Sequence, residues 1–281
     1  MSDLVIGLLH PGDMGAAVGK CLTGLGYQVR WASDGRGQAT AACAAGAGLS
    51  DAGTVAALAA GSAVILSICP PHAAVDVARS VAAAGFRGLF ADANAISPAT
   101  SRAVAGIIEG RGGSYVDGGI IGLPPSAPGS TRLYLSGPRA GEIRELLSGS
   151  WVDARIVAGP PGGASAVKMA YAAWTKGTAA LLLAARALAE AEGVRDELLA
   201  EWALSQPALA ARSQSAARSA AVKGWRWVAE MEEISGSMAA AGLPPGFHQA
   251  AAEIFRRQPR VLDGDAVTFS DVIGALLSPP Q

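Results

Sequence analysis

The sequence predicts an α/β chain in which a doubly wound parallel sheet is followed by an all-helical domain. Up to about residue 160, short β-branched or apolar runs alternate with alanine-rich helical stretches, which is the pattern of βαβ units on a parallel sheet. A cluster of chain breakers, residues 159–163, then interrupts this pattern, and no strand-like run follows it. We therefore expect two domains, residues 1–160 and residues 161–281.

The strands of the first domain are expected where β-branched and other apolar residues cluster, and the helices where alanine dominates. Ser97 before Pro98 offers an N-cap with a proline in the first helical turn, and Pro138 is expected to start a helix at residue 139 in the same way. The expected strands are residues 4–9, 28–32, 63–68, 89–92, 115–118, 131–136 and 155–157, and the expected helices are residues 14–25, 72–84, 98–108 and 139–147.

The second domain is expected to be built around one long alanine- and leucine-rich helix, residues 164–192, with Gly193 as its C-cap. Few charges lie between Lys176 and Arg186, so this helix presents more apolar surface than a small helical domain easily covers. We therefore expect a homodimer. Further helices are expected at residues 196–205, 208–222, 225–241, 245–257 and 270–277.

Composition and charge indicate a small-molecule partner. The 281 residues are 51% hydrophobic, enough for a substantial core, and the 22 basic and 23 acidic residues are scattered without long runs. This balance gives no electrostatic footprint for nucleic acid or an anionic membrane, and no apolar run is long enough to span one. Three cysteines without paired spacing indicate a reducing compartment, so we expect a cytoplasmic protein without a metal site.

A glycine turn follows the first expected strand and leads directly into an alanine-rich helix. A dinucleotide fingerprint needs this context, because the amides and dipole of the helix N-terminus receive the pyrophosphate. His10 stands where the motif G-x-G-x-x-G has its first glycine, so an ordinary glycine-rich turn is the alternative. The residues expected to contact the cofactor here are Gly7, His10, Pro11, Gly12, Asp13 and Met14.

Three later motifs strengthen this interpretation: residues 67–71 (SICPP), residues 92–94 (DAN) and residues 117–122 (DGGIIG). A fourth stretch, with the pattern G-x-x-x-x-x-K, begins at Gly162 and ends at Lys168. With the glycine turn, they resemble the β-hydroxyacid dehydrogenase superfamily, which includes 3-hydroxyisobutyrate dehydrogenase, 6-phosphogluconate dehydrogenase and the imine reductases. The chain looks most like a branch with HPG in the glycine turn and a 6-phosphogluconate-dehydrogenase-like C-terminal domain.

The resemblance implies a Rossmann-like dinucleotide-binding domain and assigns roles to individual residues. It implies that Cys69, Pro70, Pro71 and Asn94 lie at the cofactor, and that Gly119, Ile121, Gly122, Lys168 and Tyr171 form the substrate site. Three positions depart from the family pattern, because Ile121 replaces a serine, Ala164 a glycine and Tyr171 an asparagine. These changes favour a less anionic and larger substrate than a hydroxy acid.

The end of the second expected strand bears on the choice of cofactor. Ser33 and Arg36 would accommodate the 2′-phosphate of NADP, whereas the nearby Asp34 would favour the ribose hydroxyls of NAD. We expect NADP rather than NAD, with a solvated loop charge as the alternative for Arg36.

Lys168 is the expected catalytic residue, because reduction of a carbonyl requires a proton and a partly desolvated lysine can donate one. Tyr171, one helical turn on, could bind the substrate or orient Lys168; the alternatives are a surface lysine and a core aromatic. The sequence thus predicts an NAD(P)-dependent oxidoreductase that moves a hydride between nicotinamide and a small C=O or C–OH substrate. Imine reduction, and a dinucleotide-binding sensor without catalysis, remain as alternatives.

Overall fold

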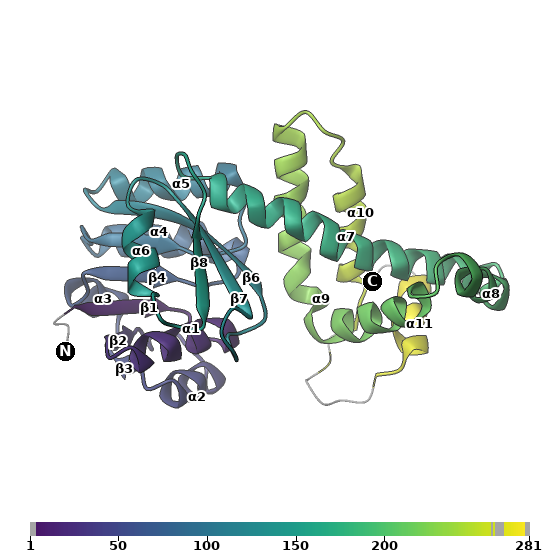
Figure 1. The fold of residues 1–281 in the computed structure, drawn as a ribbon, viewed down its shortest axis with the longest axis horizontal. Coiled ribbons are helices and arrows are strands. Elements are labelled where there is room, and N and C mark those ends of the chain that lie inside the picture. The colour runs from purple at the N-terminus through teal and green to yellow at the C-terminus, as the bar shows by residue number, and fades with distance from the viewer. Residues whose placement is uncertain (1–3, 260, 262–266, 279–281) are drawn as a thin grey trace. The chain divides into compact units, whose positions relative to one another are not determined.

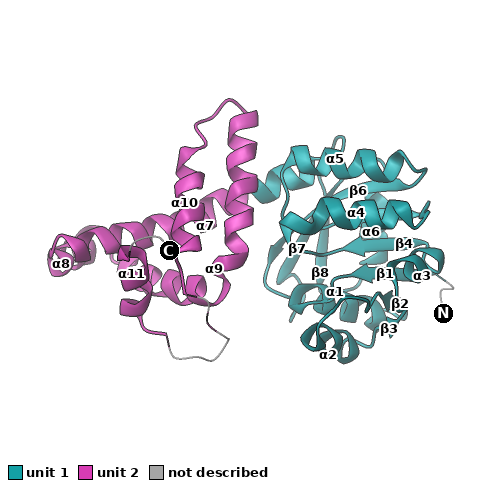
Figure 2. Ribbon diagram, turned by 180° about the vertical axis from the view of Figure 1, so that it is seen from behind, with its two compact units in different colours: residues 1–169 teal, residues 170–281 magenta. Residues whose placement is uncertain are grey.

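The computed structural model describes residues 4–259, 261 and 267–278, and the chain divides into two compact units (Figure 2). The first unit is Met1–Met169 and the second is Ala170–Gln281. The division falls inside helix α7 (Gly163–Ala191), a few residues beyond the glycine and proline cluster at which a boundary was expected. The roles assigned to the two expected domains stay predictions.

The first unit is organised around one sheet, which has eight strands in the described part of the chain (Figure 1). Its order is β3-β2-β1-β4-β5-β6-β7-β8, and all neighbours are parallel except β6 and β7, which are antiparallel. The predicted α/β class is thus confirmed. The strands are β1 (Val5–Leu9), β2 (Gln28–Trp31), β3 (Ser50–Asp51), β4 (Val64–Ser67), β5 (Leu89–Asp92), β6 (Ser114–Gly122), β7 (Thr131–Ser136) and β8 (Val152–Ile156).

Helices cover both faces of this sheet, so the winding is double, as expected. One core cluster joins α1, α2 and α6 to residues such as Ile6 and Leu8 of β1, and the other joins α3, α4 and α5 to residues such as Phe90 of β5. Burying these branched and aromatic side chains stabilises the unit by about 2 kcal/mol each. The helices are α1 (Asp13–Gly24), α2 (Gln38–Gly46), α3 (Val55–Ala60), α4 (Ala74–Ala83), α5 (Pro98–Glu109) and α6 (Ala140–Leu146), with a 3₁₀ turn, η1 (Pro71–Ala73), before α4.

Local details confirm one predicted helix start and correct another. The Ser97 hydroxyl accepts the Thr100 N–H at 3.1 Å, and Pro98 opens α5, as predicted. The prediction for Pro138 was wrong, because α6 begins at Ala140 with no side-chain cap; Gly137, at φ 111°, forms the preceding turn and accepts the Ala140 N–H. Strand β6 extends to Gly122 instead of ending at residue 118, and β8 begins at Val152 instead of residue 155.

The described part of the second unit is helical. It contains the rest of α7, α8 (Arg195–Ser205), α9 (Leu209–Ala240), α10 (Gly246–Arg256) and α11 (Phe269–Leu277). Gly193, at φ 70°, ends α7 as predicted, and the Val194 N–H donates to the Ala189 carbonyl at 2.9 Å. The prediction of two helices between residues 208 and 241 was wrong, because α9 continues without a break through Gly224, which is buried.

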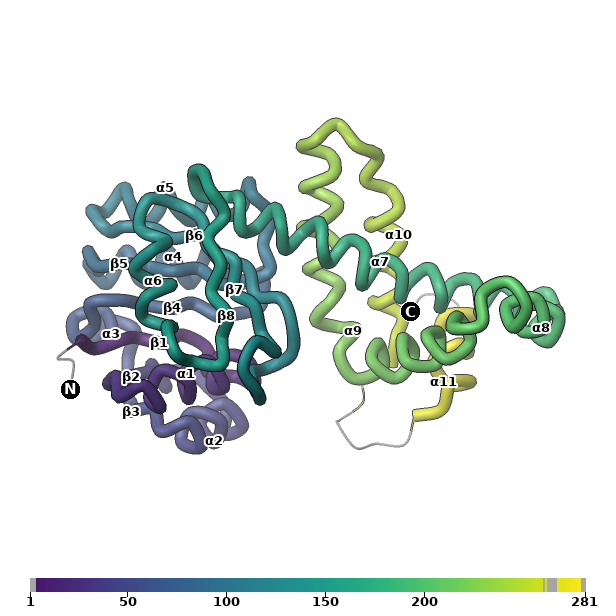
Figure 3. The backbone as a smooth tube through the Cα atoms, in the orientation of Figure 1, coloured from purple at the N-terminus to yellow at the C-terminus, as the bar shows by residue number. Residues whose placement is uncertain are grey.

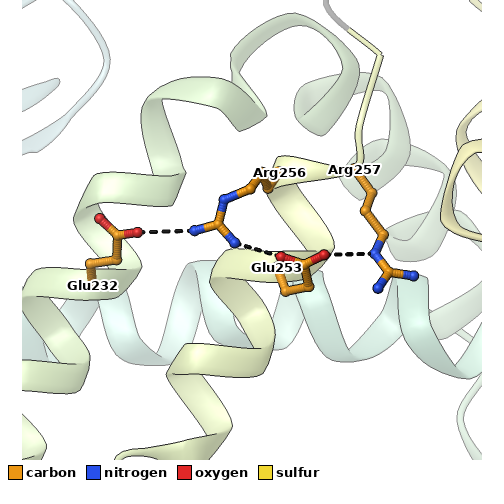
Figure 4. Close-up of polar contacts among 4 residues, drawn as sticks. All are labelled: Glu232, Glu253, Arg256 and Arg257. Atoms are coloured by element: carbon orange, nitrogen blue, oxygen red, sulfur yellow. Dashed lines mark hydrogen bonds and ion pairs between the residues drawn. The ribbon is translucent and has the colours of Figure 1, made fainter. Parts of the chain in front are cut away.

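Helices α9 and α10 form an antiparallel hairpin within this unit (Figure 3). Most of its buried side chains are apolar, and the rings of Trp227 and Phe255 meet edge to face with centroids 5.0 Å apart. On the outside, Arg256 bridges Glu232 at 3.0 Å and Glu253 at 2.5 Å, and Arg257 also contacts Glu253 (Figure 4). These exposed ion pairs contribute about 0–1 kcal/mol each, so apolar packing holds the hairpin. No helix in the described ranges has both the length and the apolar character needed to cross a membrane.

Candidate active site

The glycine turn after β1 creates an open helix N-terminus. His10 adopts φ 60°, the Gly12 N–H donates to the His10 carbonyl at 2.8 Å, and α1 begins at the next residue. A Cβ on Gly15 would lie 2.5 Å from the His10 carbonyl oxygen, so only glycine lets the helix approach the turn. A Cβ on Gly12 would meet no atom within 4 Å, so the space beside the first turn of α1 can accept an anion.

The other residues predicted at this turn lie in different surroundings. Gly7 is buried inside β1, where a methyl group would come within 2.9 Å of Ser62 Oγ and 3.0 Å of the Ile65 side chain. Packing therefore explains this glycine. Pro11 is buried, Asp13 is exposed in the first turn of α1, and Met14 packs against the core cluster that holds α1.

The charge of Arg36, on the loop after β2, influences His10 on the loop after β1 and Cys69 on the loop after β4. Burial, together with the charge of Arg36, lowers the pKa of His10 to about 4. The ring is therefore neutral at pH 7, and its Nδ1 is buried without a hydrogen-bond partner. Burial raises the pKa of the Cys69 thiol to about 12, while Arg36 acts in the opposite direction. The Cys69 thiol is thus unreactive, so this residue can contribute to the site through its backbone.

The loop after β2 has an acidic neighbour on β3 that could not be predicted from the sequence. Asp51, at the end of β3, accepts the Gly53 N–H at 2.7 Å and also a hydrogen bond from Ser33, and these contacts lower the pKa of its carboxyl group. The Ser33 hydroxyl therefore already has a carboxylate partner. No signal could have identified Asp51, since a two-residue strand has no hydrophobic pattern.

Asn94 connects the carboxyl ends of β4 and β5. Its Oδ1 accepts the Cys69 N–H at 2.5 Å, and its Nδ2 donates to Ser67 Oγ at 3.2 Å. The side chain is 2% exposed, so it holds the Cys69 backbone in place beside the glycine turn. Pro70 is exposed and Pro71 opens η1, immediately after this fixed residue.

Four buried polar residues form a row across the carboxyl ends of the strands. Ser67, Asp92, Asp117 and Ser136 are register partners on β4, β5, β6 and β7. Asp92 accepts the Asn94 N–H at 2.9 Å through Oδ1, whereas its buried Oδ2 has no hydrogen-bond partner. Burial raises the pKa of Asp92 to about 7, and the charge of Asp117 adds to this effect.

Lys168 lies directly against β6. A Cβ on Gly119 would lie 2.9 Å from the Lys168 Cβ and 2.9 Å from the Ala164 carbonyl oxygen, so the first turns of α7 rest on this glycine. The structure thus brings two of the predicted substrate residues together, and Lys168 is half-buried. Ile121, two residues further along β6, is 4% exposed, and Gly122, at φ 125°, ends the strand at a point where a Cβ would lie 2.5 Å from the Ser130 carbonyl oxygen.

Tyr171 belongs to the second unit, one turn beyond Lys168 on α7, and its side chain is 46% exposed. Its carbonyl accepts the Thr175 hydroxyl at 3.1 Å. Within the residues that the structure describes, no group of His, Cys, Asp and Glu is arranged to hold a metal ion.

The chain matches known proteins over part or nearly all of its length. Residues 189–258 match a family described as a domain of unknown function, DUF1932. A stretch of 136 residues is 29% identical to an uncharacterized 28.5 kDa protein, encoded in a 7S RNA 5′ region, of Methanothermus fervidus. This stretch is 48% of the chain and 51% of the relative, so the chain spans about half the length of the curated relative it matches.

Solved structures align with nearly the whole chain. A conserved protein of unknown function, reported to resemble 3-hydroxyacid dehydrogenases, aligns with a TM-score of 0.68 and 25% identity over 98% of this chain and 100% of its own. The chain has the 3-hydroxyacid dehydrogenase fold. The 3-hydroxyisobutyrate dehydrogenase of Mycobacterium tuberculosis aligns with a TM-score of 0.70 and 21% identity over 98% of this chain and 99% of its own. A reductive aminase of Aspergillus terreus aligns with a TM-score of 0.58 and 20% identity over 91% and 93% of the two chains.

The family resemblance predicted from the sequence is therefore confirmed, at the level of the fold.

Proposed function

We propose that this chain is an NADP-dependent oxidoreductase that transfers a hydride between nicotinamide and the carbonyl or alcohol carbon of a small molecule. The proposal rests on what lies at the edge of the sheet where the parallel strands have their carboxyl ends. The open N-terminus of α1 follows β1. Leu9 of β1 is linked to Asp117 of β6 through the register partners Ser67 and Asp92, and the Lys168 Cβ lies against Gly119, two residues beyond Asp117. In open α/β sheets this edge binds dinucleotides and their substrates.

The residues at this edge fit a dinucleotide. The open space beside Gly12 and the positive end of the α1 helix dipole suit a pyrophosphate. Arg36, close enough to influence both His10 and Cys69, supplies a cation for a 2′-phosphate. Asp34 on the same loop and Asp51 at the end of β3 would favour ribose hydroxyls, so cofactor preference is the balance between Arg36 and these two carboxylates.

The bound nicotinamide would supply or accept the hydride. The chain's part in the reaction is then to hold the substrate and to move a proton. Lys168, with Cβ fixed over Gly119, is proposed to donate a proton to the substrate oxygen during reduction and to accept it during oxidation. Ile121 contributes a buried hydrocarbon surface where the family has a serine, which favours substrates without a carboxylate at that position. Tyr171 is proposed to bind the substrate as well.

Reduction of a C=N bond is the second candidate. It is supported by the likeness to the reductive aminase, whose structure was determined with NADPH4, cyclohexanone and allyl amine. The apolar Ile121 surface would accept an amine product as readily as an alcohol. A dinucleotide-binding sensor without catalysis is the third candidate, and it requires Lys168 to have no chemical role.

The proposal also covers the cellular compartment, the substrate and the assembly. The three cysteines, all free in the structure, favour a reducing compartment such as the cytoplasm. The substrate is a small molecule, and a homodimer is proposed as the assembly.

The test is NADPH oxidation by the full chain with a panel of aldehydes, ketones and imines, together with NADP⁺ reduction by the same chain with a panel of alcohols and hydroxy acids. Lys168→Ala and Lys168→Met should each lower turnover about 10²–10⁴-fold, the usual contribution of a general acid, with NADPH affinity unchanged. A variant that keeps most of its activity, while folded and saturated with NADPH, would remove Lys168 from the reaction. NADPH binding without turnover on any member of either panel would favour the sensor.

A further inference from the structure

The carboxylate of Asp117 receives five hydrogen bonds although it is completely buried. Oδ1 accepts the hydroxyls of Ser101 on α5 at 2.9 Å and of Ser165 on α7 at 2.5 Å. Oδ2 accepts the Ser136 hydroxyl at 2.8 Å and two backbone N–H groups, of Gly162 at 2.9 Å and Ser165 at 3.0 Å. One side chain of β6 therefore joins three other segments of the first unit.

Three of these five contacts come from the beginning of α7. The first N–H groups of a helix have no acceptor within the helix and need one from elsewhere. Here a strand side chain supplies it, and the negative charge also suits the positive end of the helix dipole. Gly162, at φ 108°, turns the chain into α7, and a Cβ there would come within 3.1 Å of Arg102. The start of α7 is thus fixed to β6 by polar contacts.

The same face of β6 then sets the position of Lys168. Gly119 follows Asp117 by two residues and therefore projects to the same side of the strand. A Cβ at Gly119 would press on both Ala164 and Lys168 at 2.9 Å, so the absent side chain lets α7 lie against the strand. Lys168 follows Ser165 by less than one helical turn. The hydrogen bonds to Asp117 thus fix the first turn of α7, and the absence of a side chain at Gly119 leaves room for Lys168 against the strand.

We propose that Asp117 is a positioning residue for the reaction: it fixes the first turn of α7 to β6 and so sets the point from which the Lys168 ammonium reaches the substrate. The idea rests on the proposed function only for the role of Lys168. The placement of Lys168 by Asp117 can be tested without any turnover.

Two pairs of variants isolate this role. Ser165→Ala and Ser101→Ala each remove one hydroxyl from the same Oδ1, but only Ser165 belongs to α7. Asp117→Ala removes the acceptor of both backbone N–H groups, whereas Asp117→Asn can keep an oxygen towards them and turn its NH₂ towards the two serine hydroxyls, which can accept. Ser101→Ala and Asp117→Asn are therefore the controls.

The first measurement is the rate at which trinitrobenzenesulfonate modifies Lys168 in the full chain, followed by mass spectrometry, with the exposed Lys20 as the internal reference. Asp117→Ala and Ser165→Ala should change the Lys168 rate relative to Lys20 at least about threefold, and the two controls should stay close to the unmodified chain. The second measurement is turnover. Because a shift of about 1 Å in a reacting group can cost roughly 10²-fold, Asp117→Ala should lower kcat about 10–100-fold, with KM and NADPH affinity nearly unchanged.

The outcomes separate this inference from the proposed function. Altered labelling with lowered kcat supports both. Altered labelling with unchanged kcat supports the placement by Asp117 and removes Lys168 from the reaction. Unchanged labelling in folded Asp117→Ala and Ser165→Ala overturns the inference whatever the turnover. Should Asp117→Ala fail to fold, the comparison of Ser165→Ala with Ser101→Ala decides, and equal labelling in these two overturns it.

Discussion

Asp92→Asn should make the stability of the first unit less dependent on pH. In the folded chain, burial raises the pKa of Asp92 from 3.8 to about 7, since one carboxyl oxygen has no hydrogen-bond partner and Asp117 lies beside it on the next strand. The unfolded chain ionises Asp92 near the ordinary value. The stability associated with this group is therefore complete below about pH 4 and is lost as the pH rises towards 7.

The size of the effect follows from the difference in pKa. A difference of about 3 pH units corresponds to about 4 kcal/mol, at 1.36 kcal/mol per unit. Between pH 5 and pH 7 the free energy of unfolding should therefore fall by about 2–3 kcal/mol because of Asp92 alone. Asparagine keeps the acceptor for the Asn94 N–H and removes the titration.

The measurement is urea denaturation, followed by circular dichroism, of the unmodified chain and of Asp92→Asn at pH 5, 6, 7 and 8. The difference between the two chains should grow in favour of Asp92→Asn by about 2–3 kcal/mol from pH 5 to pH 7, while any packing effect of the amide cancels. Asp76→Asn, which removes an exposed carboxylate on α4, controls for the change in net charge. A difference that is the same at pH 5 and pH 7 would refute the reasoning.

Three further predictions concern the cofactor, the site and the assembly. Arg36→Ala should weaken NADPH binding about tenfold or more and leave NADH binding nearly unchanged in fluorescence titrations, because only the 2′-phosphate needs the cation; an equal loss for both would contradict this. Gly119→Ala should lower kcat about tenfold or more, because the added Cβ displaces α7. Gly106→Ala, with open space around its Cβ, should leave kcat unchanged. Equal rates for the two variants would show that the contact between Gly119 and α7 is unimportant. Sedimentation should show a dimer at micromolar concentration that Leu181→Glu dissociates and Leu204→Glu does not; a monomer before any change would end the proposal. The exposed apolar side chains of α7 behind this last prediction are Tyr171, Trp174, Leu181 and Leu188.

Hydrophobic pattern was sufficient to predict most of the sheet, and it failed where there was no pattern. The strands richest in β-branched and apolar residues, such as β1 and β4, were predicted to within one residue at each end. The segment containing α2, β3 and α3 was not predicted at all. Helix α2 is alanine on nearly every side and therefore has no amphipathic period, and β3 has only two residues.

The candidate site shows the same limit in its polar contacts. The glycine turn was predictable because all its parts are local in sequence. The role of Asp117 was not, since its partners Gly162 and Ser165 lie 45 and 48 residues away along the chain. Asn94 was predicted at the cofactor, and the structure shows what its amide already binds, the Cys69 backbone and Ser67. Its direct contact with a cofactor stays a prediction.

His10 has a consequence for how dinucleotide motifs are recognised. Among the residues that the structure describes, it is the one non-glycine residue with positive φ, and it occupies the place where the usual motif has its first glycine. Histidine is one of the few other residues that tolerate this conformation. The physical requirement at such a turn would then be a left-handed backbone and not a glycine. A motif search that asks for glycine at this position would therefore miss chains that have histidine or asparagine there.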